Sequence, residues 1–303
     1  MPSGVIQIQG HTAVRGNSFH SSASLGVTLF MGEKVPMEEL LKQADLAMYK
    51  SKGAGRNAFT FFDPTMEANI LARSQTETDL RRAIDEEQFV LHYQPILSGN
   101  TRRISGAEVL IRWQHPQLGM VFPNDFIQQA EETGLILPIG KWVLQTACRQ
   151  LALWAKIPGR EQLTIAVNVS AVQFRQNGFV EQVIAILEET GANPKCLKLE
   201  LTESLFVQDI EDIISKMSSL RTIGVGFSLD DFGTGYSSLS YLSRLPLDLL
   251  KIDRSFVMDI ETTSNNIAIC AATISLAHSL GLRVVAEGVE TEAQKFFLTT
   301  VHR

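Results

Sequence analysis

The sequence predicts an α/β fold in which mostly parallel strands form a barrel, and three observations support this prediction. From Phe89 onward, β-prone runs alternate with segments of helical periodicity, which is typical of parallel strands joined by crossover helices. Many of the runs end in a polar residue, which favours a barrel over a doubly wound sheet because barrel enzymes build their sites from many strand ends. The 303 residues, 45% of them hydrophobic, can bury a large core.

The first sixty residues follow a different pattern. Residues 22–30 have the composition of a strand, and residues 36–50 carry apolar side chains at helical spacing. A glycine-rich segment at 53–57 ends this helix, and residues 58–62 predict a second short strand. Asp63 and Pro64 then suit the N-cap and the first position of a helix that continues through Gln75 and Asp79. Residues 63–76 are therefore expected to be a helical connector.

The remaining chain supplies the strands of the predicted barrel. The expected strands cover residues 89–94, 104–112, 163–169, 197–202, 224–230, 248–252 and 282–287. Four polar residues stand at or near the ends of different strands: Glu108, Asn168, Glu200 and Asp230. A barrel would gather these side chains in one mouth, where the carboxylates would repel one another and raise their pKa values. Divalent cations would remove that repulsion.

An all-oxygen donor set without histidine or cysteine suits Mg²⁺ or Mn²⁺ and suits Zn²⁺ less well. The six histidines are scattered and lack ligand spacing. Residues 228–239 add the paired carboxylates Asp230 and Asp231 and a glycine loop, and Lys251 follows after the next apolar run. Two ions a few ångström apart could hold a phosphodiester and activate a water. The pattern therefore predicts phosphodiester hydrolysis.

The sequence resembles the EAL family of cyclic di-GMP phosphodiesterases over approximately residues 77–298. The segments that carry the resemblance are residues 106–112, 165–170, 197–203, 228–239, 250–253 and 284–290. The resemblance implies a TIM-like (β/α)8 barrel over residues 77–303, with a first strand antiparallel to its neighbours. The tripeptide that names the family reads Glu108-Val109-Leu110 here. Residue 109 faces away from Glu108 in a strand, so valine in place of the alanine of the family's tripeptide changes packing by about 1–3 kcal/mol in a tight pocket, by less in a loose one, and leaves the ligand untouched.

The resemblance also implies roles for individual residues. The positions that match metal ligands are Glu108, Asn168, Glu200, Asp230, Asp231 and Glu287. Asp231 and Glu287 also count as catalytic, together with Lys251, which matches the lysine that positions or polarises the attacking water. Gln94 and Arg112 match substrate-contacting positions, and Arg112 suits a phosphate oxygen. Glu203 matches the residue that holds the loop at 231–238 in place.

Residues 44–57 resemble the C-terminal end of a GGDEF diguanylate cyclase domain, whose signature loop does not occur in the chain. Residues 1–62 are therefore expected to be an α+β remnant of that domain without catalytic activity. Lys52 and Arg56 match phosphate-contacting positions of whole domains, but solvated charges near a helix end are the better interpretation.

Several site residues have a structural alternative. Glu203 suits the start of a helix beside Thr202, and Lys251 could be an edge lysine whose stem packs on apolar groups. Arg112 could stack with Trp113 on the surface, and the glycines at 233 and 235 could form a simple turn. Independent explanations of this kind would have to hold at every strand end at once, which favours a functional site.

Three functions remain open. The leading hypothesis is a metal-dependent enzyme that converts cyclic di-GMP to pGpG, which the intact ligand set favours. The second is a catalytically impaired module that binds cyclic di-GMP without cutting it. The third is a barrel enzyme acting on another phosphorylated metabolite, which explains the ligands but not the agreement of the loops.

Composition restricts location and partners. No run approaches the length of a membrane span, and the first residues lack the regions of a signal peptide, so we expect a cytoplasmic protein, with any membrane anchor of the parent protein upstream of residue 1. The net charge of −6 argues against a DNA or RNA surface. Cys148, Cys196 and Cys270 are expected to be buried free thiols. The resemblance implies a homodimer with the loop at 231–238 near its interface.

The C-terminal end is expected to be incomplete. A helix is predicted to begin near Thr291, and the sequence stops at Arg303 before an eighth strand. Family members continue with a substrate-contacting glutamine and the closing strand of the barrel. The sequence thus predicts a fragment of a GGDEF-EAL protein whose open barrel associates easily, binds cyclic di-GMP weakly and hydrolyses little.

Overall fold

The computed structural model describes residues 9–14, 17–32, 35–53, 57–99, 103–207, 209–233, 239–260 and 263–301. The chain divides into two compact units, residues 1–78 and 79–303. The boundary falls within a single helix, α2 (Thr65–Asp85). Asp63 Oδ1 accepts a hydrogen bond from the Thr65 N–H at 2.8 Å, so the predicted helix start is confirmed. The helix continues without a break past residue 76, the predicted end of the connector.

In its described residues, the first unit contains two small sheets and one helix in addition to the first part of α2. Strands β1 (Gln9–Val14) and β2 (Asn17–Ser22) pair antiparallel, whereas β3 (Leu25–Val27) and β4 (Phe59–Phe61) pair in parallel. Helix α1 (Met37–Gly53) packs closely on β3, because a Cβ atom at Gly26 would lie 1.8 Å from the carbonyl oxygen of Ala44. The predicted helix and second strand are confirmed. The predicted first strand at 22–30 is too long, since β3 ends at Val27, and Arg56 lies outside the described residues.

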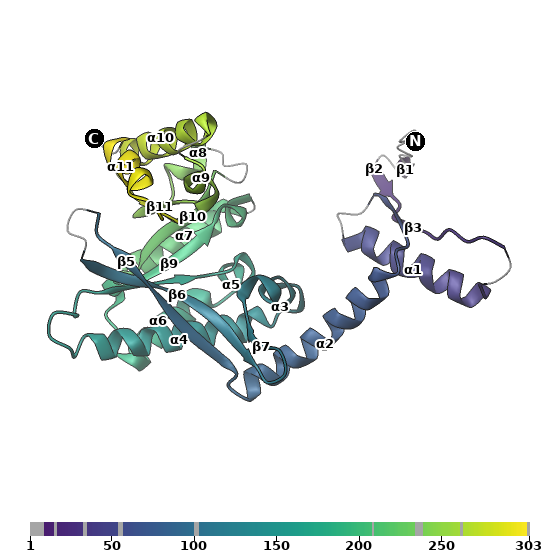
Figure 1. The fold of residues 1–303 in the computed structure, drawn as a ribbon, viewed down its shortest axis with the longest axis horizontal. Coiled ribbons are helices and arrows are strands. Elements are labelled where there is room, and N and C mark those ends of the chain that lie inside the picture. The colour runs from purple at the N-terminus through teal and green to yellow at the C-terminus, as the bar shows by residue number, and fades with distance from the viewer. Residues whose placement is uncertain are drawn as a thin grey trace. The chain divides into compact units, whose positions relative to one another are not determined.

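The second unit is built on a curled sheet with strand order β12-β11-β10-β9-β8-β6-β5 (Figure 1). These strands are β5 (Phe89–Leu97), β6 (Ile104–His115), β8 (Thr164–Asn168), β9 (Leu197–Thr202), β10 (Gly226–Phe232), β11 (Leu249–Ile252) and β12 (Arg283–Ala286). Strands β5 and β6 pair antiparallel, and the pairs from β6 to β12 along this order are parallel. All seven predicted strands and the antiparallel first strand are confirmed. The fold is the predicted α/β, TIM-like type.

Within the described residues, the sequence analysis missed three strands: β1 and β2 of the first unit, and one strand of the second unit. Strand β7 (Gly119–Val121) forms a hairpin with the end of β6. Helices connect the remaining strands: η1 (Pro123–Asp125), α3 (Ile127–Thr133), α4 (Ile136–Trp154), α5 (Ala171–Arg175), α6 (Phe179–Thr190), η2 (Pro194–Cys196), η3 (Glu203–Val207), α7 (Ile210–Thr222), α8 (Leu239–Leu242), α9 (Arg254–Met258), α10 (Ser264–Ser279) and α11 (Glu292–Val301). Within the described residues, β5 and β12 are the two edges of the sheet.

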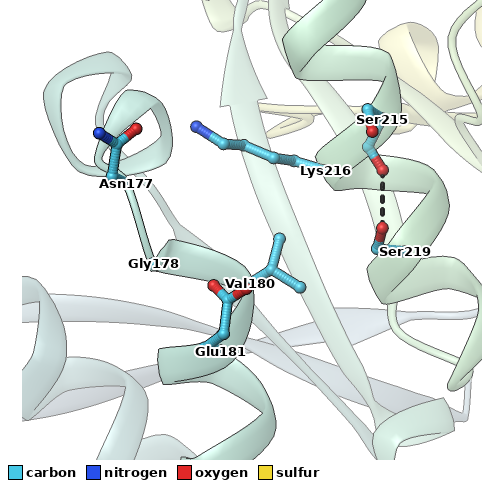
Figure 2. A pocket seen from close by; sticks show the side chains of 7 residues that line it. All are labelled: Asn177, Gly178, Val180, Glu181, Ser215, Lys216 and Ser219. Atoms are coloured by element: carbon cyan, nitrogen blue, oxygen red, sulfur yellow. Dashed lines mark hydrogen bonds between the residues drawn. The ribbon is translucent and has the colours of Figure 1, made fainter.

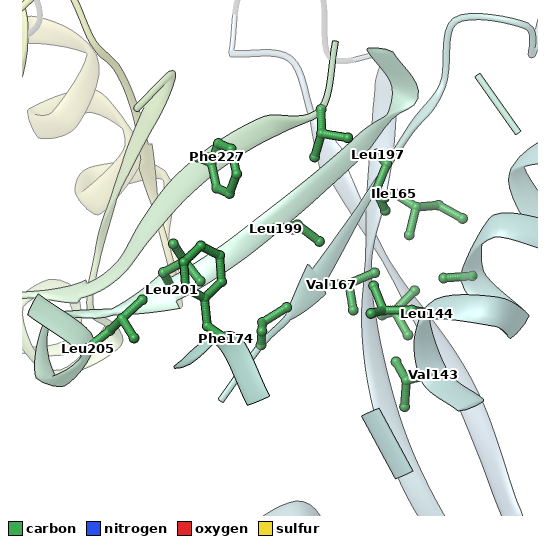
Figure 3. Packing of buried hydrophobic residues seen from close by; sticks show 14 of the residues in the cluster. Val143, Leu144, Ile165, Val167, Phe174, Leu197, Leu199, Leu201, Leu205 and Phe227 are labelled. Carbon is green, nitrogen blue, oxygen red and sulfur yellow. The ribbon is translucent and has the colours of Figure 1, made fainter. Parts of the chain in front are cut away.

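The core lies between the sheet and its helices. Leu199 and Leu201 of β9 lie beside Phe227 of β10, with Val167 of β8 and Leu144 of α4 in the same cluster (Figure 3). Successive strand side chains point to opposite faces, so the alternate positions of these strands face the barrel interior. Val109 is 3% exposed and belongs to this core, as predicted for the residue that faces away from Glu108.

Candidate active site

Carboxylate and amide side chains meet at the carboxyl ends of neighbouring strands. In the sheet register Asn168 of β8 lies opposite Glu200 of β9, and Ser228 of β10 lies opposite the same glutamate. Asp230 follows two residues after Ser228 and so shares its face of the sheet. The alternation that buries the leucines of β9 against helices therefore directs Glu200 into the barrel interior.

Lys251 of β11 lies at the centre of this cluster. Its Nζ atom is 2.6 Å from Glu287 Oε1, 2.9 Å from Glu200 Oε2, 3.0 Å from Asp230 Oδ2 and 3.1 Å from Glu108 Oε2. The lysine side chain is only 4% exposed. Burying a charge is costly unless it is paired, and here one ammonium group is paired with four carboxylates.

Further hydrogen bonds orient the carboxylates. Asn168 Nδ2 donates to Glu108 Oε1 at 2.9 Å, which leaves the amide oxygen of Asn168 for another partner. Ser228 Oγ donates to Glu200 Oε1 at 3.3 Å. The sequence analysis did not select Ser228, although its position two residues before Asp230 on one strand was a usable signal.

The electrostatic environment shifts several pKa values. Burial raises the pKa of Glu200 to about 8; Lys251 opposes that rise, and the charges of Glu108 and Asp230 add to it. Burial also raises the pKa of Glu287, against the influence of Lys251. For Lys251, burial acts to lower the pKa, but the surrounding carboxylates outweigh it and hold the pKa above its ordinary value. The lysine is therefore a stable cation.

Asp231 has a different hydrogen-bond partner from Asp230. Its φ is +54°, a left-handed conformation that is uncommon outside glycine, and its side chain hydrogen bonds with Asp253. Burial raises the pKa of Asp231, and the charges of Asp230 and Asp253 add to the rise. Asp253 in turn accepts from the Ser255 N–H at 2.9 Å. Asp253 was missed by the sequence analysis, and its place two residues after Lys251 could have indicated it.

The two predicted substrate contacts lie on the same face of the sheet as Glu108. Gln94 is exposed and stands opposite Glu108 in the β5–β6 register, whereas Arg112 is four residues farther along β6. Arg112 Nη1 donates to the Ile111 carbonyl at 2.8 Å, and its guanidinium carbon lies 5.1 Å from the centre of the Phe122 ring. In the described part of the chain, neither residue hydrogen bonds with the Lys251 cluster.

Glu203 contacts the start of the loop that follows β10. Its Oε1 accepts a hydrogen bond from the Gly233 N–H at 2.8 Å. Residues 234–238 lie outside the described residues, so only the beginning of this loop is placed. Arg175, which the sequence analysis did not select, donates to the Leu205 carbonyl at 2.8 Å and so supports the short helix η3 that begins at Glu203.

The cluster has the donor chemistry of a divalent cation site. One carboxylate oxygen each from Glu108, Asp230 and Glu287 lies within 4.8 Å of the other two. Carboxylate and amide oxygens are the ligands that hard divalent ions prefer. The residues therefore fit a divalent metal.

A surface hollow lies away from this cluster, between α7 and the turn that joins α5 to α6 (Figure 2). Lys216 extends along it, donates to the Arg175 carbonyl at 3.1 Å and pairs with Asp212 at 2.9 Å. Its charge is thus used to hold the end of α5. This hollow contains no carboxylate group of the strand ends, and we assign it no role in the chemistry.

Comparison with known proteins agrees with this geometry. Residues 77–301 match the family described as EAL domain. The chain is 46% identical over 278 residues to the bifunctional diguanylate cyclase/cyclic di-GMP phosphodiesterase MucR of Pseudomonas aeruginosa, covering 92% of this chain and 40% of that protein. It is 37% identical over 285 residues to the cyclic di-GMP phosphodiesterase PdeR of Escherichia coli, covering 92% and 42%. The chain thus spans about two fifths of the length of these curated relatives.

Among solved structures, the chain is similar to that of a MucR phosphodiesterase in complex with c-di-GMP. The TM-score is 0.72 at 48% identity, covering 75% of this chain and 92% of that one. In the described part of the chain, no helix has both the length and the apolar composition needed to cross a bilayer.

Proposed function

The chain belongs to the EAL domain family, and on this basis we propose that it hydrolyses cyclic di-GMP to linear pGpG. The observation that carries the proposal is the group of four carboxylates around Lys251 at the carboxyl ends of the barrel strands. The similar MucR structure was solved with c-di-GMP, and the PdeR relative is named for the same reaction.

The proposed reaction breaks one phosphodiester bond of the cyclic dinucleotide. A water oxygen adds to one phosphorus, the bond from that phosphorus to a 3′ oxygen breaks, and the 3′ oxygen takes up a proton. Arg112 would bind a phosphate oxygen through its N–H groups, and Gln94 would contact the dinucleotide from the neighbouring strand. Lys251 would hold and polarise the attacking water through its ammonium group.

We propose that the site binds two divalent ions, either Mg²⁺ or Mn²⁺. Glu108, Asn168, Glu200, Asp230, Asp231 and Glu287 would hold them. When bound, such ions would lower the pKa of the attacking water and neutralise charge on the phosphate. The oxygen-only donor set supports this choice over Zn²⁺. Glu203 would keep the loop at 231–238 in place through its hydrogen bond to Gly233.

We also propose a cellular setting. Cys148, Cys196 and Cys270 are free and buried, which supports a reducing compartment such as the cytoplasm. The family resemblance supports a homodimer through the second unit, which light scattering would test, and the net charge of −6 argues against DNA or RNA as a partner. Residues 1–62 are proposed to be the non-catalytic remnant of a GGDEF domain.

The decisive experiment incubates the full chain with cyclic di-GMP and separates the products by chromatography. We expect a small amount of pGpG to form with Mg²⁺ or Mn²⁺, because weak binding and low turnover are predicted for this chain, and none to form with excess chelator. Ca²⁺ should inhibit because its larger, looser coordination misplaces the water. Binding without cleavage would favour the receptor alternative. Absence of both binding and cleavage would refute the proposed function.

A further inference from the structure

The hairpin formed by β6 and β7 brings an aromatic ring beside the proposed phosphate-binding arginine. Trp113 of β6 pairs with Val121 of β7 in antiparallel register, so the next residue, Phe122, comes opposite Arg112. Opposite residues of an antiparallel pair present their side chains on the same face. The guanidinium carbon of Arg112 accordingly lies 5.1 Å from the Phe122 ring centre, within the range of a cation–π contact.

The ring is carried by a well-supported turn. The buried His115 accepts, at its Nδ1 atom, hydrogen bonds from the backbone N–H groups of Gln117 and Leu118, both at 3.1 Å. On the other side of Phe122, Pro123 opens the short helix η1 and restricts the backbone there. Phe122 itself is 53% exposed, so the hydrophobic core does not account for its position.

The contact limits how the arginine side chain can move. Arg112 Nη1 donates to the Ile111 carbonyl at 2.8 Å, and contact with the ring face leaves the other N–H groups of the guanidinium available for a phosphate. Phe122 offers no polar atom that would compete for those N–H groups. Arg112 shares the face of β6 that carries Glu108, so its fork is held on the side of the carboxylate cluster.

We propose that Phe122 is a positioning residue that holds the Arg112 guanidinium ready for a phosphate group of the dinucleotide. The proposal rests on the proposed function, since it gives Phe122 a task in binding the same substrate. Phe122 acts through Arg112, and the mechanism requires no direct contact of the ring with the reacting atoms.

The first test compares Phe122→Leu with Phe122→Tyr and with Leu118→Ala in the full chain with Mg²⁺. Leu118 is 73% exposed on the same hairpin and is the matched control. We expect Phe122→Leu to raise KM about two- to fivefold while kcat stays within about twofold, as loss of an exposed cation–π contact implies. Phe122→Tyr and Leu118→Ala should keep the original KM. An unchanged KM in Phe122→Leu would overturn the proposal.

A double-mutant cycle tests whether the effect passes through Arg112. On an Arg112→Ala background, Phe122→Leu should cause no further loss of affinity for cyclic di-GMP, measured by calorimetry with Ca²⁺ in place of Mg²⁺. The same fold-loss on both backgrounds would contradict the proposal. The unmodified chain distinguishes a failure of the proposed function from a failure of the Phe122 proposal: if it neither binds nor cuts cyclic di-GMP, the proposed function fails.

A measurement without substrate covers the case of a poorly folding variant. The Nε–Hε resonance of Arg112 in the unmodified chain should be displaced by the ring current of Phe122. It should return toward the ordinary arginine position in Phe122→Leu and stay in place in Leu118→Ala. A resonance of the unmodified chain at the ordinary position would show that the stacking does not persist in solution, and the proposal would fall.

Discussion

Asp230 joins the two kinds of contact that organise the cluster. Its Oδ2 accepts from Lys251 at 3.0 Å, and its Oδ1 accepts from the Asp231 N–H at 2.9 Å. It also contributes one of the three oxygens that lie close enough together to share a cation. A change at this one side chain should therefore affect metal binding more than it affects packing.

We expect Asp230→Asn, which keeps the volume of the side chain, to lower turnover of cyclic di-GMP by at least about 100-fold, since losing even an outer partner of a metal ligand costs 10- to 100-fold. The melting temperature should change little. Glu290→Gln is the control, because Glu290 pairs with Arg254 at the surface and should leave turnover unchanged. Turnover of Asp230→Asn within twofold of the unmodified chain would place the site elsewhere.

Cys148 is predicted to be unreactive in the native protein. Burial raises the pKa of its thiol to about 12, and the side chain is fully buried. Because the thiolate is the reactive form, almost none is present at pH 8. We expect alkylation of Cys148 to require unfolding, as measured by mass spectrometry of labelled protein with and without denaturant. Rapid labelling of the native protein would show that the helix α4 opens locally.

Among the elements, the pair β6–β8 depends on a glycine. A Cβ atom at Gly106 would lie 2.4 Å from the Thr164 carbonyl oxygen of the neighbouring strand. We expect Gly106→Ala to force the strands apart and to cost about 1–3 kcal/mol of unfolding free energy, measured by denaturant titration. At Gly99 in the preceding turn, such a Cβ would have no atom of the described residues within 4 Å. Gly99→Ala should therefore be neutral, and equal losses in both variants would refute the steric explanation.

The elements also show what local sequence can and cannot predict. The strands of the main sheet were found because they are apolar runs bounded by turns, and their polar ends stand out against the core. Strand β7 has only three residues, too few for a period to appear, and it exists through its pairing with β6. The strand predicted at 22–30 continued to Phe30 because its last residues are apolar, yet Phe30 is 59% exposed.

At the scale of the whole molecule, the resemblance and the strand-end pattern predicted which side chains lie close together better than they predicted the contacts between them. Glu108, Asn168, Glu200, Asp230, Lys251 and Glu287 come together from five strands and the end of a sixth, as expected. Their mutual geometry depends on the register between strands, which no local pattern encodes. For the same reason the sequence did not indicate Phe122 or Asp253: the contact of Phe122 depends on the β6–β7 pairing, and that of Asp253 depends on the left-handed conformation of Asp231 in β10.

The position of Lys251 implies that its ammonium group and a divalent ion would replace one another in the carboxylate cluster. This ammonium group and a divalent ion bound in the proposed site would compete for the same oxygens, so the apparent metal affinity would be the difference between two binding equilibria. Lys251→Met should lose about 3–5 kcal/mol of stability in chelator, as removal of one partner from a buried ion pair does, and should gain more from Mn²⁺ than the unmodified chain does.

Thermal melting with a Mn²⁺ titration measures both effects, and Lys198→Met, two residues before Glu200 on β9, is the matched control. Equal melting of Lys251→Met and the unmodified chain in chelator would show that the ammonium is not a counter-ion in solution. If exchange occurs, the displaced ammonium remains beside the cluster on β11. Binding of the ion would then also release the Lys251 ammonium to hold the attacking water.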